Sequence, residues 1–451
     1  MLFIVSPFKE TILTFGFFFL LPIGLNYHPI LIPARDFFKP IVGVVIYGYD
    51  IPLFFLFMLL LKRLCSIERK DIDLILPVSI PFLLIFMSAV LGSPRIESPT
   101  VIKFWSLVTV FKCFLTFLIV ANSIRTKDIL KFIFYLFLVS VFFQAFICLA
   151  QIISGSSLGL GFLGETETSV ETVTAGSKEL LRVGGSMSKN ALASYLSFII
   201  PINFALFFTK IQLRTKICFF LPVILLAFTL EILTFSRGAW MGLAVGGTLT
   251  FYGCICRLSG RKVLSLFFVS IVIVAFIVLI LALSESVRQR LFEDDYGSAI
   301  IRIPLMINAL NMILHNPFLG VGLGNYTSVN QHYDIFQWIS IVFPWPVHND
   351  FLLIGAEMGL PAMLSFCFII VVVLFKLLQT AFQSKDDLLG YTAFALIGGI
   401  VAFSIHHLVA YVYVMLNTPF WSFMGIAFAL IFIDRRERKK DSAEETGKIP
   451  Q

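Results

Sequence analysis

Charged residues are scarce in this sequence. They make up 14% of the 451 residues, whereas a soluble domain has about a quarter. Hydrophobic residues make up 58%, and uncharged apolar runs long enough to cross a bilayer recur along the chain. This composition excludes an ordinary soluble domain. Because such runs are also much longer than the alternating strands of an outer-membrane barrel, the sequence predicts a membrane protein with helical spans.

Cysteine is also sparse, and none falls in a predicted exterior loop. No disulfide framework is implied, and the spacing of Cys254 and Cys256 inside a predicted span is poor for zinc, so packing is the favoured role. The sequence lacks a convincing cleavage site after Lys9, so the first apolar run is expected to remain as a span. The seven cysteines are Cys65, Cys113, Cys148, Cys218, Cys254, Cys256 and Cys367.

Twelve apolar segments can be marked along the chain, the first of them interrupted by Pro22, Gly24 and Asn26. The predicted fold is therefore an all-α polytopic membrane protein of about 12 transmembrane helices. Residues 1–433 would form a single transmembrane domain, followed by a basic, disordered cytoplasmic tail over 434–451 that touches anionic lipid. The expected spans are 11–32, 41–61, 74–92, 101–121, 132–154, 190–208, 217–233, 239–256, 263–283, 352–378, 391–413 and 416–433.

Basic residues orient these spans. One alternate set of loops, together with the tail, holds 20 of the 34 lysine and arginine residues, while the opposite and longer set holds 9. The positive-inside rule therefore puts both termini in the cytoplasm. Because the net charge of +7 reflects this bias and the basic tail, it is no indication of nucleic-acid binding.

Two long loops fall on the predicted exterior face, over 155–188 and, between spans 9 and 10, over 284–351. Long loops without an obvious structural need tend to carry function. The first begins flexible and acidic. The second contains an apolar pattern over 298–314 that predicts a helix along the bilayer surface, bent at Pro304. An aromatic stretch over 326–346 follows, which could pack at the interface or line a carbohydrate groove.

Arg237 lies in LTFSRGAWMGL, the short exterior turn between spans 7 and 8. An arginine at the membrane boundary is costly unless it pairs or reaches water, and its planar guanidinium suits a diphosphate. Gly238 would let a ligand approach closely. The alternative is an arginine that snorkels and anchors the end of the helix. Arg302, with Arg288 and Arg290 as weaker partners, could hold a second phosphate or sugar, or could bind lipid headgroups.

His348 lies in WPVHNDFLLIGAEMG, where the second long loop meets span 10. Histidine titrates near neutral pH and can take a proton from an attacking hydroxyl, although a lone loop histidine is more often an interface residue. Asn349 and Asp350 could orient the ring or cap the following helix, and capping is the default for Asp350. Glu357 is out of phase with His348 on a helix, so a polar contact inside the bundle is expected for it.

Two other features are weighed as structural. The glycine-rich GVGLGN (320–325) is no dinucleotide loop, because no strand precedes it; its amides could bind an anion, but a turn after a helix explains the glycines equally well. His406 and His407 could suggest a proton relay, but they lie in the exterior half of span 11 and helix packing is favoured. No exterior cluster of paired acidic residues suited to Mg²⁺ or Mn²⁺ is evident.

The order of these motifs resembles the O-antigen ligase and polymerase superfamily. SRGAW is followed by Arg302, NPFLGVGLGNY and VHNDFLLIGAEMGL, and RVGGSMSKNALASYLSFIIP, which contains Asn190, is also similar to that family. The resemblance implies a metal-independent, inverting glycosyltransferase without a cofactor, whose donor is a glycan on a polyprenyl (undecaprenyl) diphosphate. Arg237 and Arg302 would bind the diphosphate, and His348 would activate the acceptor hydroxyl, with Asn349, Asp350 and Asn190 in support. The protein would lie in a bacterial inner membrane.

The acceptor stays open between three possibilities. A ligase transfers the finished glycan to a lipid A–core sugar, a polymerase joins repeat units, and a third group glycosylates protein hydroxyls. The long 155–188 loop favours a dedicated acceptor surface, and hence a ligase. A flippase of lipid-linked sugars is the alternative from another class, but transporters place ionisable residues near mid-membrane, often in two related halves, and no internal repeat is evident.

Overall fold

The computed structural model describes residues 7–31, 43–65, 72–96, 99–166, 169–175, 178–260, 285–292 and 300–445. This part of the chain is mostly helical and contains nine helices that are long and apolar enough to cross a membrane. The protein is thus a multi-pass membrane protein. The nine spans are Leu76–Arg95, Thr100–Ser123, Lys127–Ser154, Lys189–Phe208, Leu213–Leu233, Arg237–Ser259, Asp350–Gln383, Asp387–His406 and Thr418–Ser442.

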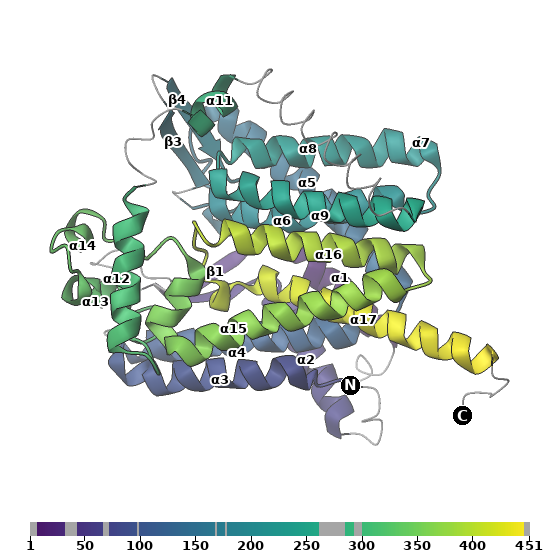
Figure 1. Ribbon diagram of the computed structural model, residues 1–451, viewed down its shortest axis with the longest axis horizontal. Coiled ribbons are helices and arrows are strands. Elements are labelled where there is room, and N and C mark those ends of the chain that lie inside the picture. Colours follow the sequence, from purple (N-terminus) through teal and green to yellow (C-terminus); the bar gives the residue numbers. More distant parts are fainter. Residues whose placement is uncertain are drawn as a thin grey trace.

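These helices run side by side along the long axis of the molecule (Figure 1). α6 (Lys189–Phe208), α16 (Asp387–His406) and α17 (Thr418–Glu445) are surrounded by other helices along most of their length. By contrast, α3 (Leu76–Gly92) and α8 (Leu221–Leu233) expose large apolar side chains, as lipid-facing helices do. The other long helices are α4 (Thr100–Ser123), α5 (Lys127–Ser154), α9 (Arg237–Ser259) and α15 (Asp350–Gln383).

Glycines allow α9 and α16 to pack closely. A Cβ at Gly242 would lie 2.3 Å from the carbonyl oxygen of Ala402, and one at Gly246 would lie 2.1 Å from that of Gly398. Gly238 belongs to the same face, since its Cβ would lie 2.4 Å from Cγ2 of Val409. Small residues of this kind let helices approach in a membrane. Gly238 therefore serves helix packing, and the expectation that it leaves space for a ligand is wrong.

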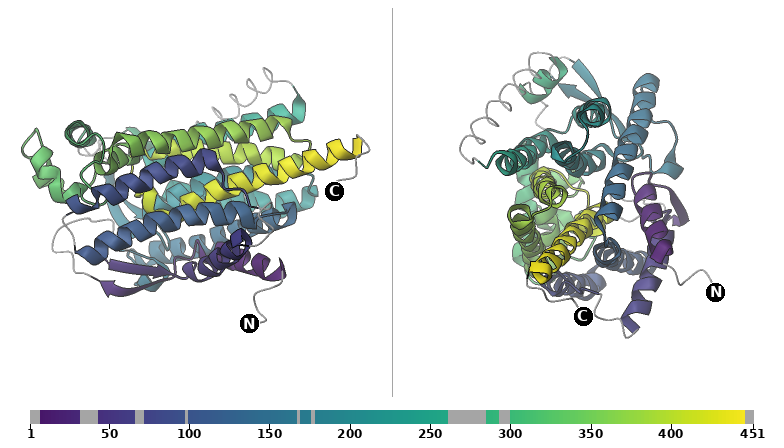
Figure 2. Two further views of the ribbon diagram at one scale, coloured as in Figure 1. Left: turned by 90° about the horizontal axis from the view of Figure 1, so that it is seen from below. Right: turned by 90° about the vertical axis from the view of Figure 1, so that its right-hand side faces the viewer.

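The amino-terminal region differs from the expected spans 11–32 and 41–61. Helix α1 (Pro7–Leu20) ends before Pro22, and α2 (Asp50–Cys65) begins only after an antiparallel hairpin of β1 (Asn26–Leu31) and β2 (Gly43–Tyr47). At 1.5 Å per residue, 14 and 16 residues give roughly 21 and 24 Å, less than the hydrocarbon core of about 30 Å. Both helices and the hairpin lie on one flank of the bundle (Figure 2). The expected span 263–283 lies outside the described residues, so the total of 12 stays a prediction.

The two ends of the bundle are built differently. The α12 end comprises the hairpin of β3 (Val170–Ala175) and β4 (Lys178–Val183), α11 (Glu285–Phe292), α12 (Arg302–His315), and residues 316–349 and 407–417. The tail end comprises the starts of α5 and α16, the end of α6, and the turns of α17 beyond Ile433. Two hairpins make the protein not strictly all-α, and β3–β4 gives the expected flexible loop 155–188 a regular core.

Helix α12 lies across the ends of the spanning helices (Figure 1). It begins at Arg302, so Pro304 falls in the first turn, where a missing backbone N–H is tolerated, and the expected bend is absent from this described helix. One face exposes Ile303, Leu310 and Leu314, as expected for a helix on a membrane surface. Its opposite face, with Ala309 and Met312, packs against the start of α15.

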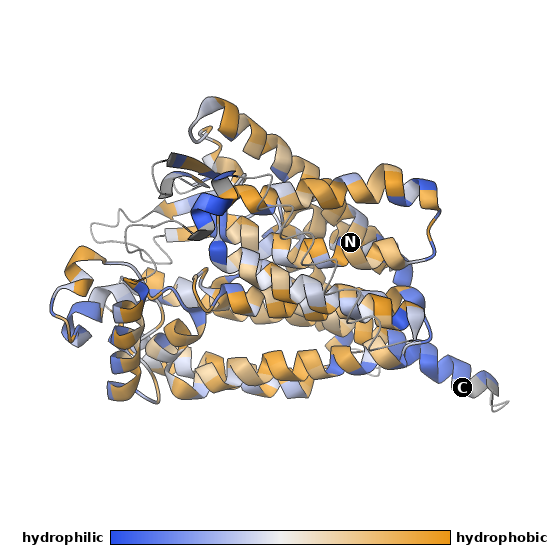
Figure 3. Cartoon of the chain, turned by 45° about the horizontal axis from the view of Figure 1, so that its top comes forward, coloured by the Kyte–Doolittle hydropathy of each residue, from blue (hydrophilic) through white to orange (hydrophobic). Residues whose placement is uncertain are grey.

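Residues 434–445 of the tail are also helical, contrary to the expected disorder; 446–451 lie outside the described residues. α17 continues to Glu445 without a break at 434, and Asp434 pairs with Arg438 one turn later at 2.7 Å. The sequence RRERKKDSAEE consists largely of residues with high helix propensity. These last turns are hydrophilic, unlike the preceding span (Figure 3).

Short elements complete the described chain. Residues 350–383 are two helices joined at Gly359, whose φ of 84° is accessible to glycine. The remaining elements are η3 (Ser93–Arg95), η4 (Gly161–Leu163), α7 (Leu213–Thr215), η6 (Lys216–Phe220), α13 (Tyr326–Val329), η7 (Asn330–Tyr333), α14 (Ile339–Val342) and η8 (Val414–Leu416).

Candidate active site

The turn between α8 and α9 places Arg237 at the first position of a helix. α8 ends at Leu233, Phe235 adopts a left-handed φ of 46°, and Ser236 is the residue that precedes α9. The amino terminus of a helix carries a partial positive charge and free N–H groups, which favour anions. Arg302 occupies the same first position in α12. Both predicted arginines therefore stand where the helix itself adds to their positive potential.

The β3–β4 hairpin brings a further arginine to this turn. Arg182 is paired with Glu171 across the hairpin, and its Nη1 donates to Glu171 Oε2 at 3.3 Å. Its Nε donates to the carbonyl oxygen of Thr234 at 2.7 Å, which joins the hairpin to the α8–α9 turn. Lys189, at the start of α6, forms an ion pair with the same glutamate. Arg182 is thus in direct contact with the turn that carries Arg237.

Four arginines gather at this place. Burial is the largest cause that lowers the pKa of Arg182 to about 10; the positive charges of Arg290, Arg302 and Arg237 contribute to the lowering, while Glu171 opposes it. Arg290 is buried, and its Nε donates to the carbonyl oxygen of Phe235 at 3.4 Å. Like charges so close together oppose one another, and a bound anion would relieve this repulsion. We call Arg182, Arg237, Arg290 and Arg302 the arginine cluster.

Arg288, which the sequence suggested with Arg290 as a partner of Arg302, is not a member of the arginine cluster. It is exposed and pairs with Glu285 on its own helix.

His348 lies beside the cluster at the entry to α15. Its ring is partly exposed, but Nδ1 is buried and has no hydrogen-bond partner among the described residues. The ring meets Tyr411 edge-to-face, with centroids 5.0 Å apart. Burial, the largest cause, and the charge of Arg302 lower the pKa of His348 to about 4, while the carbonyl of Pro346 acts in the opposite direction. The imidazole is therefore neutral at pH 7 and able to accept a proton.

The two residues after His348 have separate roles. Asn349 is the capping residue of α15, since its Oδ1 accepts a hydrogen bond from the N–H of Leu352 at 3.0 Å. Asp350 does not cap the helix, so that expectation is wrong. Its Oδ2 instead accepts from the N–H of Val412 at 3.2 Å and lies 2.7 Å from Nδ1 of His407.

Glu357 holds the glycine-rich turn against α15. Its carboxylate accepts hydrogen bonds from the N–H groups of Gly324 at 2.8 Å and Tyr326 at 3.2 Å. The N–H groups of Val321 and Gly322 donate to carbonyls at the end of the first α15 helix. These amides already have acceptors within the chain, so the turn is structural. The expected polar contact of Glu357 inside the bundle is confirmed, and this contact helps to set α12 against α15.

Asn190 lies in the first turn of α6, with its carbonyl accepting a hydrogen bond from Ser194 Oγ at 2.7 Å. His406 ends α16, and residues 407–413, expected to continue span 11, form a loop instead. That loop carries Tyr411 to His348. The hydropathy of VAYVYVML concealed this end of the helix. The sequence assigned no role to Arg182, although its motif RVGG resembles the superfamily, and none to Tyr411, because each depends on contacts between distant segments.

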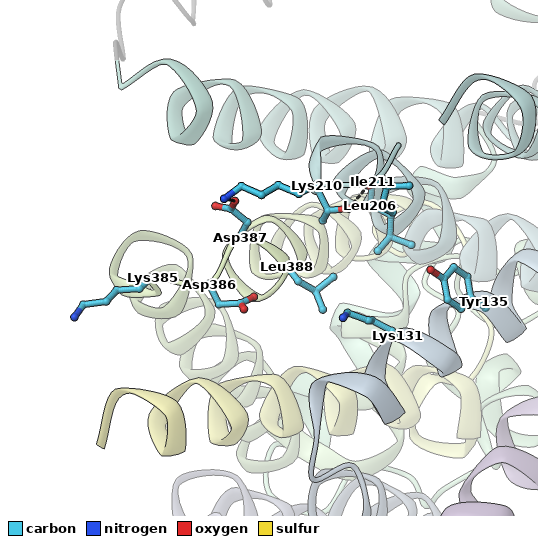
Figure 4. A pocket seen from close by; sticks show the side chains of 10 residues that line it. Lys131, Tyr135, Leu206, Lys210, Ile211, Lys385, Asp386, Asp387 and Leu388 are labelled. Carbon is cyan, nitrogen blue, oxygen red and sulfur yellow. Dashed lines mark hydrogen bonds and ion pairs between the residues drawn. The ribbon is translucent and has the colours of Figure 1, made fainter. Parts of the chain in front are cut away.

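The tail end contains a cavity lined by charged residues (Figure 4). Lysines line it together with acidic residues of the α15–α16 loop, and these charges pair: Lys210 with Asp387 at 3.2 Å, and Lys127 nearby with Asp386 at 2.7 Å. Because its charges are mutually compensated, we place the candidate active site at the α12 end.

Part of the chain is similar to a known family. Residues 221–367 match the family model described as O-antigen ligase. This range includes Arg237, Arg302 and His348, and it supports the O-antigen ligase-like superfamily, so the resemblance inferred from the sequence is confirmed. The match indicates a membrane enzyme of ligase or polymerase type. A search of curated proteins finds no match.

Proposed function

We propose, on the premise that residues 221–367 belong to the O-antigen ligase family, that this protein is a glycosyltransferase. It would transfer a glycan from a polyprenyl diphosphate to a sugar hydroxyl, with the arginine cluster holding the diphosphate and His348 acting as general base. The observation that carries the proposal is the arginine cluster beside a neutral histidine. Three helices, α6, α9 and α12, also begin at this place, and their amino termini favour an anion.

The chemistry needs no covalent intermediate. The acceptor oxygen attacks the anomeric carbon as its proton passes to a ring nitrogen of His348, and the bond from that carbon to the diphosphate breaks. The diphosphate leaves with the bonding electrons, and the configuration inverts. Arginine N–H groups aimed at the leaving oxygens stabilise the charge that develops on them. The proton is later released to water.

Donor binding would also prepare the base. In the free protein the charge of Arg302 lowers the pKa of His348. A diphosphate bound at Arg302 offsets that charge, so the pKa of His348 rises toward its ordinary value and the ring becomes a stronger base. The histidine would then be most effective when the donor is in place.

The lipid tail of the donor would reach the site from the bilayer. The exposed apolar face of α12, with Ile303, Leu310 and Leu314, lies at the level where headgroups meet acyl chains in our placement. The basic tail end would face the cytoplasm and the α12 end the periplasm of a bacterial inner membrane. The glycan acceptor would approach from water, and neither metal ion nor cofactor would be needed.

Among acceptors we favour a lipid A–core sugar, and so a ligase. The β3–β4 hairpin offers a structured surface beside the arginine cluster, which suits a dedicated acceptor. A repeat-unit polymerase and a protein glycosyltransferase would need the same base and arginines. A flippase of lipid-linked sugars would not need His348, which separates it experimentally.

Deletion of the protein followed by gel analysis of surface glycans tests the proposal. For a ligase, we expect long polyprenyl-linked polymer to accumulate while lipid A–core stays bare. Surface glycan limited to a single repeat would show a polymerase, and unchanged glycans would contradict the assignment. Glycan transfer by the purified protein should persist in EDTA. If the His348→Ala variant still moved lipid-linked sugar across the membrane of vesicles, that result would favour a flippase.

A further inference from the structure

A row of five buried polar side chains connects the two halves of the candidate site. Ser236 Oγ lies 3.2 Å from Nε2 of His406, whose Nδ1 lies 3.3 Å from Ser194 Oγ. Ser194 Oγ also lies 2.8 Å from Nε2 of His407, and Nδ1 of His407 lies 2.7 Å from Asp350 Oδ2. All five residues are buried. We call this set the polar row.

Each end of the polar row adjoins a predicted site residue. Ser236 immediately precedes Arg237, at the start of α9. Asp350 is two residues after His348, at the start of α15, and its own N–H donates to the carbonyl oxygen of His407 at 2.9 Å. The row therefore runs from the turn that carries Arg237, through α16 and α6, to the segment that carries His348.

The polar row is costly if it serves stability alone. Buried polar and ionisable groups carry a desolvation penalty, and well-packed apolar residues often stabilise a protein as well or better. Asp350 shows this cost directly, because its Oδ1 is buried and has no hydrogen-bond partner among the described residues. By contrast, such groups define geometry well, since each hydrogen bond restrains the orientation of the next ring.

We propose that Ser194 and His407 are positioning residues that hold the Arg237 turn and the His348 segment in one relative geometry. This inference rests on the proposed function. Neither residue would touch the substrate. The donor diphosphate at Arg237 and the acceptor oxygen at His348 must be aligned within a few tenths of an ångström for efficient transfer, and the row supplies a direct hydrogen-bonded connection between them.

A cycle of mutations tests this connection, with purified protein, a polyprenyl-diphosphate-linked glycan and its acceptor. Because each change breaks the same row, Ser236→Ala and Asp350→Asn should each lower kcat/KM about tenfold, with the same division between kcat and KM. The residues do not touch, so independent sites would give a product of about a hundredfold in kcat/KM. We expect the double variant to lose only about 10- to 20-fold, because either change already breaks the row.

Ser194→Ala breaks the row in the middle. In a protein that already carries Ser194→Ala, the further change Ser236→Ala should therefore alter kcat/KM less than about twofold. Ser194→Thr keeps the hydroxyl and should retain the coupling. Ser197→Ala is the matched control: Ser197 is buried in the same helix, and its Oγ donates to the carbonyl oxygen of Ala193 one turn earlier. Its loss should leave kcat, KM and the coupling unchanged.

Thermal unfolding and gel filtration identify variants that do not fold. If Asp350→Asn is one of them, His407→Gln replaces it in the cycle with the same expectation. Two results would overturn this inference while leaving the proposed function intact, provided that the wild type transfers glycan. One is that the losses in kcat/KM of Ser236→Ala and Asp350→Asn multiply fully in the double variant. The other is that Ser197→Ala lowers kcat/KM as much as Ser194→Ala does. Absence of transfer by the wild type would overturn the proposed function and the inference with it.

Discussion

The basic residues at the two ends of the bundle have different surroundings. At the tail end, Lys127 lies between Asp386 and Glu437 at 2.7 and 2.8 Å, and Lys210 meets Asp387. At the α12 end, Arg182 lies close enough to three other arginines for their charges to lower its pKa. Compensated, water-exposed pairs contribute little and need no ligand. Arg182 also pairs with Glu171, but like charges near one another still repel, and this repulsion supports the anion site that we propose there.

Arginine is used at both ends, and its surroundings differ in the same way. Arg257, at the tail end, donates to the carbonyl oxygens of Ala381, Ser384 and Asp386 at 3.1, 2.8 and 3.0 Å. These bonds tie α9 to the loop between α15 and α16. Arg237 instead stands at a helix start within the arginine cluster. The two arginines thus occupy different surroundings, one among backbone carbonyls and one at a helix start near other arginines.

The largest effect on glycan transfer is expected from loss of His348, compared with loss of another histidine at the α12 end. His348→Ala should lower kcat for glycan transfer about 10²- to 10⁴-fold, the usual contribution of a general base. His315→Ala is the control, because His315 is exposed and contacts the carbonyl of Asn311 on its own helix. Transfer by purified variants is the measurement, and equal activity of His348→Ala and the wild type would remove this residue from the mechanism.

The next effect compares the two arginines. Arg237→Lys keeps the charge but loses the paired N–H donors, so kcat/KM for the donor should fall roughly 10- to 100-fold. Arg257→Lys should lower the melting temperature, since it loses bonds to three carbonyls, while the donor KM stays unchanged. The reverse pattern, with Arg257→Lys weakening donor use and Arg237→Lys only stability, would invert our assignment of the two ends.

A moderate effect is expected in the pH profile. The pKa of His348 is lowered to about 4, so the neutral base persists below pH 6.5 and is lost only as the pH falls through about 4. The acid limb of kcat/KM should therefore lie near pH 4 in the wild type. Arg302→Gln removes a nearby positive charge, so its limb should move to higher pH. An acid limb that does not move would show that Arg302 does not act on His348.

The smallest effect is expected at the tail end. Lys127→Ala removes the pairs with Asp386 and Glu437, which are partly exposed. Such pairs contribute about 0–1 kcal/mol, so thermal unfolding should change by only a few degrees and glycan transfer should not change. A large loss of transfer would mean that the tail end takes part in the reaction.

Local sequence patterns predicted much of the candidate site. Arg237, Arg302 and His348 could be found because each stands where a polar segment meets an apolar one, in an order that resembles a known superfamily. The polar contact of Glu357 also followed from residue spacing, whereas the sequence left GVGLGN open between a structural turn and an anion-binding loop. These features depend on neighbours in the chain or on a nearby helix, which a sequence shows directly.

Contacts between distant segments were harder to predict. Arg182 reaches this place because a hairpin folds back on the α8–α9 turn; the motif RVGGSMSKN that it begins resembles the superfamily, but the sequence does not show that contact. His407 was assigned to a span because the apolar residues after it mask the end of α16. In the fold, Gly24 and Pro22 ended the first helix earlier than hydropathy alone predicts, since hydropathy does not record backbone geometry.

The central claim is that the α12 end binds a lipid diphosphate, and direct binding tests it best. Purified protein in nanodiscs would be titrated with polyprenyl diphosphate that carries no glycan. We predict that Arg182→Gln weakens binding about tenfold or more, consistent with loss of a charged hydrogen bond, while Lys210→Gln at the tail end leaves the Kd unchanged. Binding unaffected by Arg182→Gln, or lost in Lys210→Gln, would contradict the account.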